Sequence, residues 1–202
     1  MKDIFNQIWK LALPYQDKRD DTGHAATSLK YAQQLVEIEN GDEDVVIPAI
    51  ILHDIGYSQL TKERRMLIFD KDASKEVRRE VQIEHQNEGA KLAGEILRKV
   101  NYPEELIKEI QEIISQHDTR EGFISKNEGL VRDADKLWRT SPEGYTAAES
   151  RRKASGKPRD GEMWKKIEEG IHKKDYFYSE KARQMADADY KRRLQESKEN
   201  AG

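Results

Sequence analysis

The sequence predicts an all-α protein, a single helical bundle with a C-terminal helical extension. Apolar residues recur at the spacing of one helix face through most of the 202 residues, which are enough for one domain with a substantial core. The most apolar segment, residues 44–54, contains Pro48, which would be awkward inside a central strand. The chain shows no internal repeat and no low-complexity segment.

The first elements are predicted as a short helix followed by two longer ones. Residues 3–12 form an amphipathic helix that stops near Pro14, and residues 24–38 form a second helix with one apolar face. We expect a buried helix over 44–54 that begins at about residue 46, so that Pro48 falls in its first turn.

The rest of the chain is also predicted to be helical, although residues 57–72 are charged and ambiguous. The string from Ser141 to Gly144 is typical of a turn, and residues 144–196 should hold two or three helices with a flexible loop at 150–161. Three helices before that turn are expected over residues 74–100, 103–117 and 127–140.

Charge and composition exclude several classes of protein. Lys and Arg number 36 against 39 Asp and Glu, a net charge of −3, which argues against a general nucleic-acid or membrane-surface binder. The chain has no cysteine, so any metal must bind nitrogen and oxygen atoms. No segment approaches the roughly 20 apolar residues of a membrane-spanning helix, and the N-terminus does not resemble a signal peptide. We therefore expect a cytoplasmic protein, with a homodimer left open.

Four of the five histidines stand where helices could bring them together. His24 begins a predicted helix, His53 and His117 end helices, and His85 lies within one. His117 continues an apolar stripe and therefore faces the core. His85 shares a helix face with Gly89, and the missing side chain there leaves room for another backbone or a bound ion.

Acidic residues accompany these histidines at core-facing positions. Asp54 follows His53 at the end of the most apolar helix, and Asp135 shares an inward face with Val131 and Ala134. An unpaired buried carboxylate costs several kcal/mol, and a bound cation removes that cost. Imidazoles and carboxylates without thiolates fit iron or manganese best, while zinc, nickel, cobalt and magnesium stay open. Six candidate ligands suit two divalent ions bridged by one carboxylate, for which Asp54 is the natural choice.

These residues carry a resemblance to a known family. The order His24, His53-Asp54 and Asp135 resembles the H…HD…D signature of the HD-domain phosphohydrolases, within the strings DTGHAATSLKYAQQL, AIILHDIGY and RDADKLW. His85 and His117 are similar to the additional histidines of the binuclear branch of that superfamily.

The resemblance implies a domain organisation and a set of ligands. It places a metal-binding catalytic domain at residues 20–140, an N-terminal helix packed on it at 1–19, and a helical extension of the same unit at 141–202. Asp133 is the alternative to Asp135, which we prefer because it occupies the aspartate of the family's A-D-x-L string. The first ion would be held by His24, His53, Asp54 and Asp135, and the second by Asp54, His85 and His117.

The resemblance implies hydrolysis of a phosphate ester or anhydride, with a nucleotide as the expected substrate, by a metal-activated water. Asp54 would take part in catalysis by bridging the ions. Lys136 and Arg139 follow Asp135, and Thr119 follows His117-Asp118, so these three residues are candidates for contacting the substrate phosphate. Tyr57 stands where several family members carry a phosphate-contacting lysine. Two other functions use a similar site: a di-iron oxygenase of the HD type, and a non-catalytic module that binds a nucleotide and signals.

Overall fold

Helices joined by short loops make up the fold, and the part of the chain that is described contains no strand. The structure, a computed structural model, describes residues 1–70, 72–154, 156 and 161–199, except for the side chains of 161–164 and 197–199. The predicted all-α class is confirmed. The helices are α1 (Asp3–Ala12), α2 (His24–Glu39), α3 (Glu43–Leu52), α4 (Lys62–Met66), α5 (Lys75–Lys99), α6 (Glu104–Ile114), α7 (Lys126–Leu137), α8 (Pro142–Ala154), α9 (Gly161–Ile171) and α10 (Glu180–Glu199). Short 3-10 segments lie at η1 (Leu13–Tyr15), η2 (Ile55–Gln59), η3 (Leu67–Phe69) and η4 (Trp138–Thr140).

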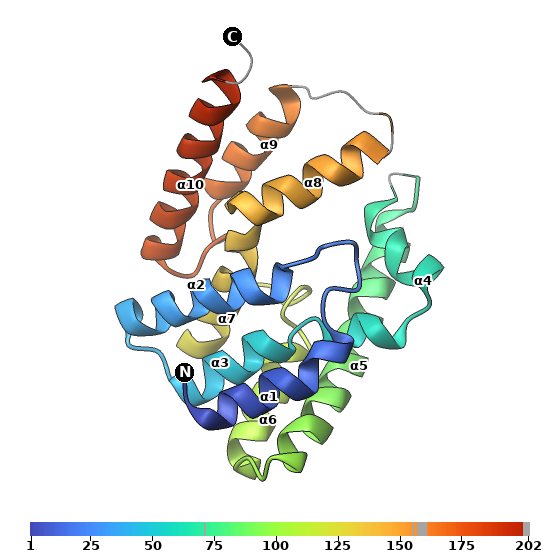
Figure 1. Cartoon of the computed structure of the whole chain (residues 1–202), viewed down its shortest axis with the longest axis vertical. Coiled ribbons are helices and arrows are strands. Elements are labelled where there is room, and N and C mark those ends of the chain that lie inside the picture. The colour runs from blue at the N-terminus through green and yellow to red at the C-terminus, as the bar shows by residue number, and fades with distance from the viewer. Residues whose placement is uncertain (71, 155, 157–160, 200–202) are drawn as a thin grey trace.

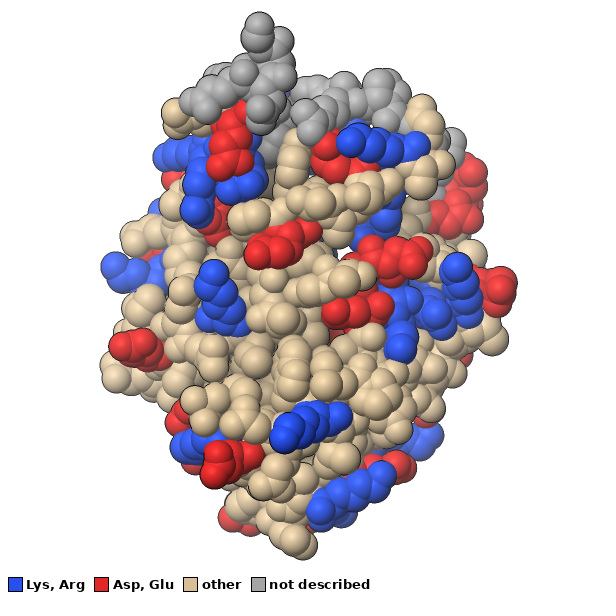
Figure 2. All heavy atoms as spheres, in the orientation of Figure 1, with Lys and Arg blue, Asp and Glu red and all other residues tan. Residues whose placement is uncertain are grey.

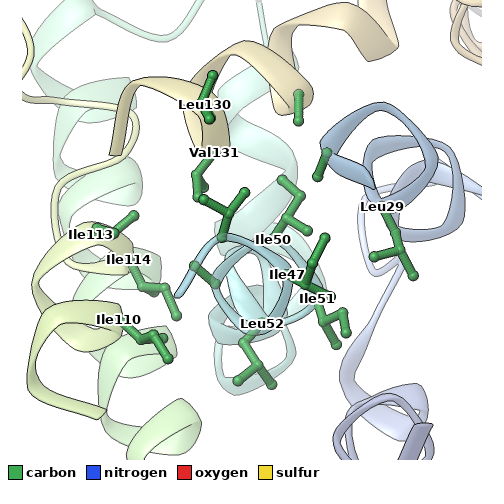
Figure 3. Packing of buried hydrophobic residues seen from close by; sticks show 14 of the residues in the cluster. Leu29, Ile47, Ile50, Ile51, Leu52, Ile110, Ile113, Ile114, Leu130 and Val131 are labelled. Atoms are coloured by element: carbon green, nitrogen blue, oxygen red, sulfur yellow. The ribbon is translucent and has the colours of Figure 1, made fainter. Parts of the chain in front are cut away.

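Helix α3 forms the centre of the core. Every residue from Val45 to Leu52 is buried, which confirms the predicted buried helix. A helix that is apolar all round must be covered on every side. Helices α1, α2, α6 and α7 pack against α3, and Figure 3 shows side chains such as Ile114 and Leu130 pointing toward it.

The start of α3 differs from the prediction. The helix begins at Glu43, because the Asp42 side chain accepts a hydrogen bond from the backbone N–H of Asp44 and caps it. Pro48 therefore lies inside the helix rather than in its first turn. A proline has no N–H to offer the carbonyl four residues earlier, which here is that of Asp44. The Tyr102 hydroxyl donates to that carbonyl at 2.7 Å and satisfies it.

The segment from Ser141 to Gly144, predicted as a turn, is the start of α8. The Ser141 hydroxyl accepts a hydrogen bond from the Gly144 backbone N–H, and Pro142 occupies the first helical position, where a missing N–H costs nothing. Proline, glycine and serine mark helix starts as well as turns, so the composition alone did not separate the two. The predicted loop at 150–161 is wrong as far as residue 154, where α8 ends; most of the remainder lies outside the described residues.

The segment after residue 141 folds back onto the earlier helices. The Asp133 carboxylate of α7 accepts hydrogen bonds from the backbone N–H groups of Tyr178 and Ser179, both at 2.8 Å, just before α10. The Ser179 hydroxyl also contacts Glu39 at 2.5 Å, and the Tyr178 ring packs against Gly129. In Figure 1, α8, α9 and α10 lie at one end of the molecule, with α2 and α7 between them and α3.

On the face that Figure 2 shows, the charged side chains form no large patch of one sign. Acidic and basic residues are interspersed there, as the small net charge of −3 leads one to expect. Within the described residues, none of the helices combines the length and the hydropathy that crossing a membrane would require.

Candidate metal centre

The His53-Asp54 pair lies where α3 meets η2, and two glycines bring that junction against α5. A Cβ atom on Gly56 would come within 1.9 Å of the His85 carbonyl oxygen, and one on Gly89 would lie 3.4 Å from the Gly56 nitrogen. The space predicted beside Gly89 is therefore filled by another backbone. This close approach, which a larger residue at 56 would prevent, places His85 next to Asp54.

A first group of ligand atoms gathers at the C-terminal end of α3. The Nε2 atoms of His24 and His53 are 3.0 Å apart, and Asp135 Oδ1 lies 3.1 Å from the first and 3.4 Å from the second. Asp54 Oδ2 lies 3.3 Å from His24 Nε2. One ligand atom from each of the four residues lies within 4.8 Å of the others, so the group could hold a metal ion.

A second group shares Asp54 with the first. Asp54 Oδ1 lies 3.4 Å from His117 Nε2 and 3.6 Å from His85 Nε2. One ligand atom from each of these three residues also lies within 4.8 Å of the others, so this group could hold an ion too. Asp118 Oδ2 lies 3.6 Å from His85 Nε2, on the same side. The two oxygens of Asp54 thus face different groups, which is the arrangement of a bridging carboxylate.

The histidine rings are oriented by backbone carbonyls. The Nδ1 atoms of His53 and His117 lie 2.8 Å from the carbonyl oxygens of Ile50 and Ile114, each three residues earlier in the chain. His85 Nδ1 lies 3.2 Å from the carbonyl of Val81. A hydrogen on Nδ1 is needed for these bonds, so Nε2 is the atom that carries the lone pair in the neutral ring and is available to a metal. Metal-binding histidines are commonly oriented in this way.

The protonation of the cluster reflects its density of charge. Burial disfavours a charged His24, but its hydrogen bonds to Asp135 and Asp54 outweigh burial and raise its pKa to about 9. Asp118 and Asp54 likewise outweigh burial at His117 and raise its pKa to about 9. Burial dominates at His85, whose pKa falls to about 4. Protons on His24 and His117 therefore offset the negative charge of the carboxylates when no metal is bound, while His85 stays neutral.

The carboxylates have their pKa values shifted in the opposite direction from that expected for buried acids. Burial would raise the pKa of Asp54, but Arg19 and His53 hold it well below its ordinary range. Hydrogen bonds from His24 and His53 do the same for the pKa of Asp135 against the effect of burial. Both groups are therefore ionised and available as ligands at neutral pH.

The residues present fit a divalent metal. The cluster offers imidazole nitrogens and carboxylate oxygens, and the Nε2 atom of His85 is buried without a hydrogen-bond partner. The Nε2 atoms of His24 and His53, 3.0 Å apart, share a proton as a hydrogen bond in the metal-free protein, and both could bind the same ion once that proton is displaced. A cavity of about 10 Å³ lies beside His24, His53 and Asp54, on the side of the loop that carries Arg19.

The structure separates the two aspartates that the sequence left open. Asp135 lies in the first group of ligand atoms, whereas Asp133 is fully buried on the other face of α7 and binds the backbone before α10. Residues two apart on a helix are about 200° apart around its axis, so both cannot face one site. The choice of Asp135 as the residue of the cluster agrees with the geometry.

The three predicted substrate contacts lie around the cluster with partners of their own. The Lys136 ammonium donates to the Tyr176 carbonyl, and Arg139 Nη1 lies 3.3 Å from the Tyr176 hydroxyl. Lys136, Arg139 and Tyr176 line a cavity of about 150 Å³ under α9. The Thr119 hydroxyl accepts from Gln86 Nε2 at 3.0 Å, on the loop that carries His117.

Arg19 is the residue of the site that sequence reasoning missed. Its guanidinium pairs with Asp54 and with Asp21, and it lies over the Tyr57 ring at 4.4 Å. The string KRDDTG around it has no periodicity that would indicate where its side chains point. The one available signal was Asp21, an acid close to His24 in the sequence. The structure shows that Asp21 is buried, and a buried acid requires a basic partner, which is Arg19.

Comparison with known proteins identifies the family. The profile of the HD domain family matches residues 22–140, more than half of the chain, and the protein therefore belongs to the HD domain family. A crystal structure of a predicted HD superfamily hydrolase from an uncultured Thermotogales bacterium is similar over 98% of this chain and 90% of its own. The TM-score is 0.62 at 18% sequence identity, which is a likeness of fold. No curated protein matches the chain.

Proposed function

We propose that this protein is a metal-dependent phosphohydrolase that cleaves a phosphate ester or anhydride, with a nucleotide as substrate. The observation that carries the proposal is the position of Asp54, whose two carboxylate oxygens face two overlapping groups of ligand atoms. Two divalent ions held side by side are a common device for displacement at phosphorus. Bound there, the ions would supply an activated water and offset the negative charge on the phosphoryl oxygens.

The side chains of this protein have definite tasks in such a reaction. His24, His53 and Asp135 would hold one ion, and His85 and His117 the other. Asp54 would bridge them and orient the attacking water. The backbone carbonyls behind His53, His85 and His117 fix the rings, so that little reorganisation is needed on binding.

A phosphorylated and partly aromatic substrate is supported by the surroundings of the cluster. Arg139 lies one helical turn after Asp135 and is exposed, so it is accessible to an anion that approaches the same face. The cavity next to it is lined by Lys136 and by the aromatic rings of Tyr176 and Phe177. Cations suit phosphate, and aromatic rings suit a base.

The proposal is tested by turnover of defined substrates. Protein stripped with a chelator and reloaded with manganese, iron, cobalt or nickel is incubated with mononucleotides, dinucleoside polyphosphates and cyclic dinucleotides. We expect release of phosphate or of a nucleotide from at least one class, abolished by the chelator and restored by metal. Fully loaded protein that turns over none of these compounds would argue against a phosphohydrolase.

A further inference from the structure

Arg19 lies at the opening of the metal centre. The four histidine side chains of the cluster are at most 5% exposed, whereas those of Arg19, Asp54, Asp118 and Asp135 are 14–19% exposed. A ligand that arrives from solvent therefore meets three carboxylates and the guanidinium of Arg19.

Two neighbours hold the guanidinium in place. Asp21 Oδ2 accepts from Arg19 Nε at 3.1 Å, and Asp21 Oδ1 accepts from the Arg19 backbone N–H at 3.1 Å. The Tyr57 ring lies under the guanidinium and is itself stacked on His85, with ring centroids 3.8 Å apart. This support engages one edge and one face of the guanidinium, and Nη2 is directed at Asp54.

The Tyr57 hydroxyl is an unsatisfied group in the same place. Tyr57 is 1% exposed, and its hydroxyl has no hydrogen-bond partner. A buried hydroxyl without a partner is unfavourable, and an oxygen atom of a ligand would satisfy it.

The charges of the loaded centre also leave Arg19 available. Four carboxylates lie within or beside the cluster: Asp21, Asp54, Asp118 and Asp135. Two divalent ions would balance those four charges, and the charge of Arg19 would then be in excess. An incoming phosphate group, which carries up to two negative charges, would restore the balance and replace Asp54 as the partner of Arg19 Nη2.

We propose that Arg19 and Tyr57 form the phosphate-binding pair of this site, Arg19 by a two-pronged contact to phosphoryl oxygens and Tyr57 by its hydroxyl. This inference rests on the proposed function, since it takes the two-ion centre as its frame. It assigns Asp21 as the positioning residue that keeps the arginine aimed at the substrate.

Binding of inorganic phosphate to manganese-loaded protein, measured by calorimetry, tests the pair directly. Four variants are compared with the unsubstituted chain: R19Q, R19K, Y57F and the control R64Q. Arg64 is a suitable control because it is an arginine of α4 that pairs with Glu84 at 2.8 Å and has no contact with the cluster. Metal content and melting temperature are recorded for each.

We expect R19Q and R19K to weaken phosphate binding by roughly tenfold or more, because a charge-assisted contact is lost or loses its fork geometry. Y57F keeps the ring and should weaken it by a few fold. R64Q should bind as the unsubstituted chain does, and all variants should keep their metal. Added guanidinium ion should partly restore binding to R19Q, which a merely structural role would not allow.

The outcomes separate this inference from the proposed function. Unchanged phosphate affinity in R19Q and R19K, or no phosphate binding by the loaded unsubstituted chain, would overturn the pair. Loss of metal from R19K would also overturn it, because Arg19 would then act through the ligands. If phosphate binding depends on Arg19 but no phosphorylated compound is turned over, the pair stands and the phosphohydrolase activity fails. If R19Q does not fold, R19K and Y57F decide.

Discussion

Helix α7 presents two aspartates to two different environments. Asp133 points toward the chain before α10, where two backbone N–H groups donate to its carboxylate. Asp135 points toward the metal centre, where the rings of His24 and His53 lie 3.1 and 3.4 Å from Oδ1. Burial would penalise both acids. One is stabilised by the backbone of its own chain, and the other by groups that also suit a metal.

The difference shows in the pKa values of the two residues. Burial raises the pKa of Asp133 to about 6 in spite of the N–H groups of Tyr178 and Ser179. The histidines hold the pKa of Asp135 well below its ordinary value against the same effect of burial. A residue type therefore does not identify a ligand; the neighbours that neutralise it do.

The largest expected effect is that of Asp135→Ala. This variant removes an acid from the first group of ligand atoms, and we expect metal affinity at that group and turnover to fall by more than about a hundredfold, since even an outer partner of a ligand is worth 10–100-fold. Metal titration followed by calorimetry measures it. Asp133→Ala is the matched control on the same helix and should keep both ions. Equal metal loss in the two variants would contradict the assignment.

The next effect is the dependence of metal affinity on pH. His24 and His117, whose pKa values are raised to about 9, carry protons at neutral pH in the metal-free protein. A metal must displace those protons, so affinity should rise by up to about tenfold per pH unit for each proton until pH 9 and then level off. His85, with a pKa of about 4, adds nothing in this range. Titrations from pH 6 to 9 in buffers of different ionisation enthalpy count the protons released. A flat profile would contradict the raised pKa values of His24 and His117.

The smallest effect is expected on the other face of α7. Asp133→Ala leaves the N–H groups of Tyr178 and Ser179 without an acceptor, and we expect the free energy of unfolding to fall by about 1–3 kcal/mol. Urea denaturation measures this change. The metal content and the turnover of the variant should match those of the unsubstituted chain. An unchanged free energy of unfolding would show that Asp133 does not anchor the chain before α10.

Much of the fold followed from the sequence because its main signals are local. The run of apolar residues from Val45 to Leu52 predicted the buried helix α3. The candidate ligands lie at the ends of predicted helices or on their inward faces, and the structure brings them together in two groups. One error involves a distant residue. Pro48 is accommodated inside α3 because Tyr102 satisfies the carbonyl that the proline leaves free, and the sequence does not link these two positions.

The same limit applies to the site. The choice between Asp133 and Asp135 depends on where residues 178 and 179 return to α7, which helical periodicity does not reveal. Arg19 lies in a charged loop whose direction is set by Asp21 and by the ring of Tyr57. The Tyr57 ring is buried, and the lack of a partner for its hydroxyl is visible only in three dimensions.

Anomalous X-ray diffraction from crystals of manganese-loaded protein tests the central claim most directly. The account predicts two anomalous peaks per chain on either side of the Asp54 carboxylate, one next to His24, His53 and Asp135 and the other next to His85 and His117. A loaded crystal without any peak beside Asp54 would contradict it.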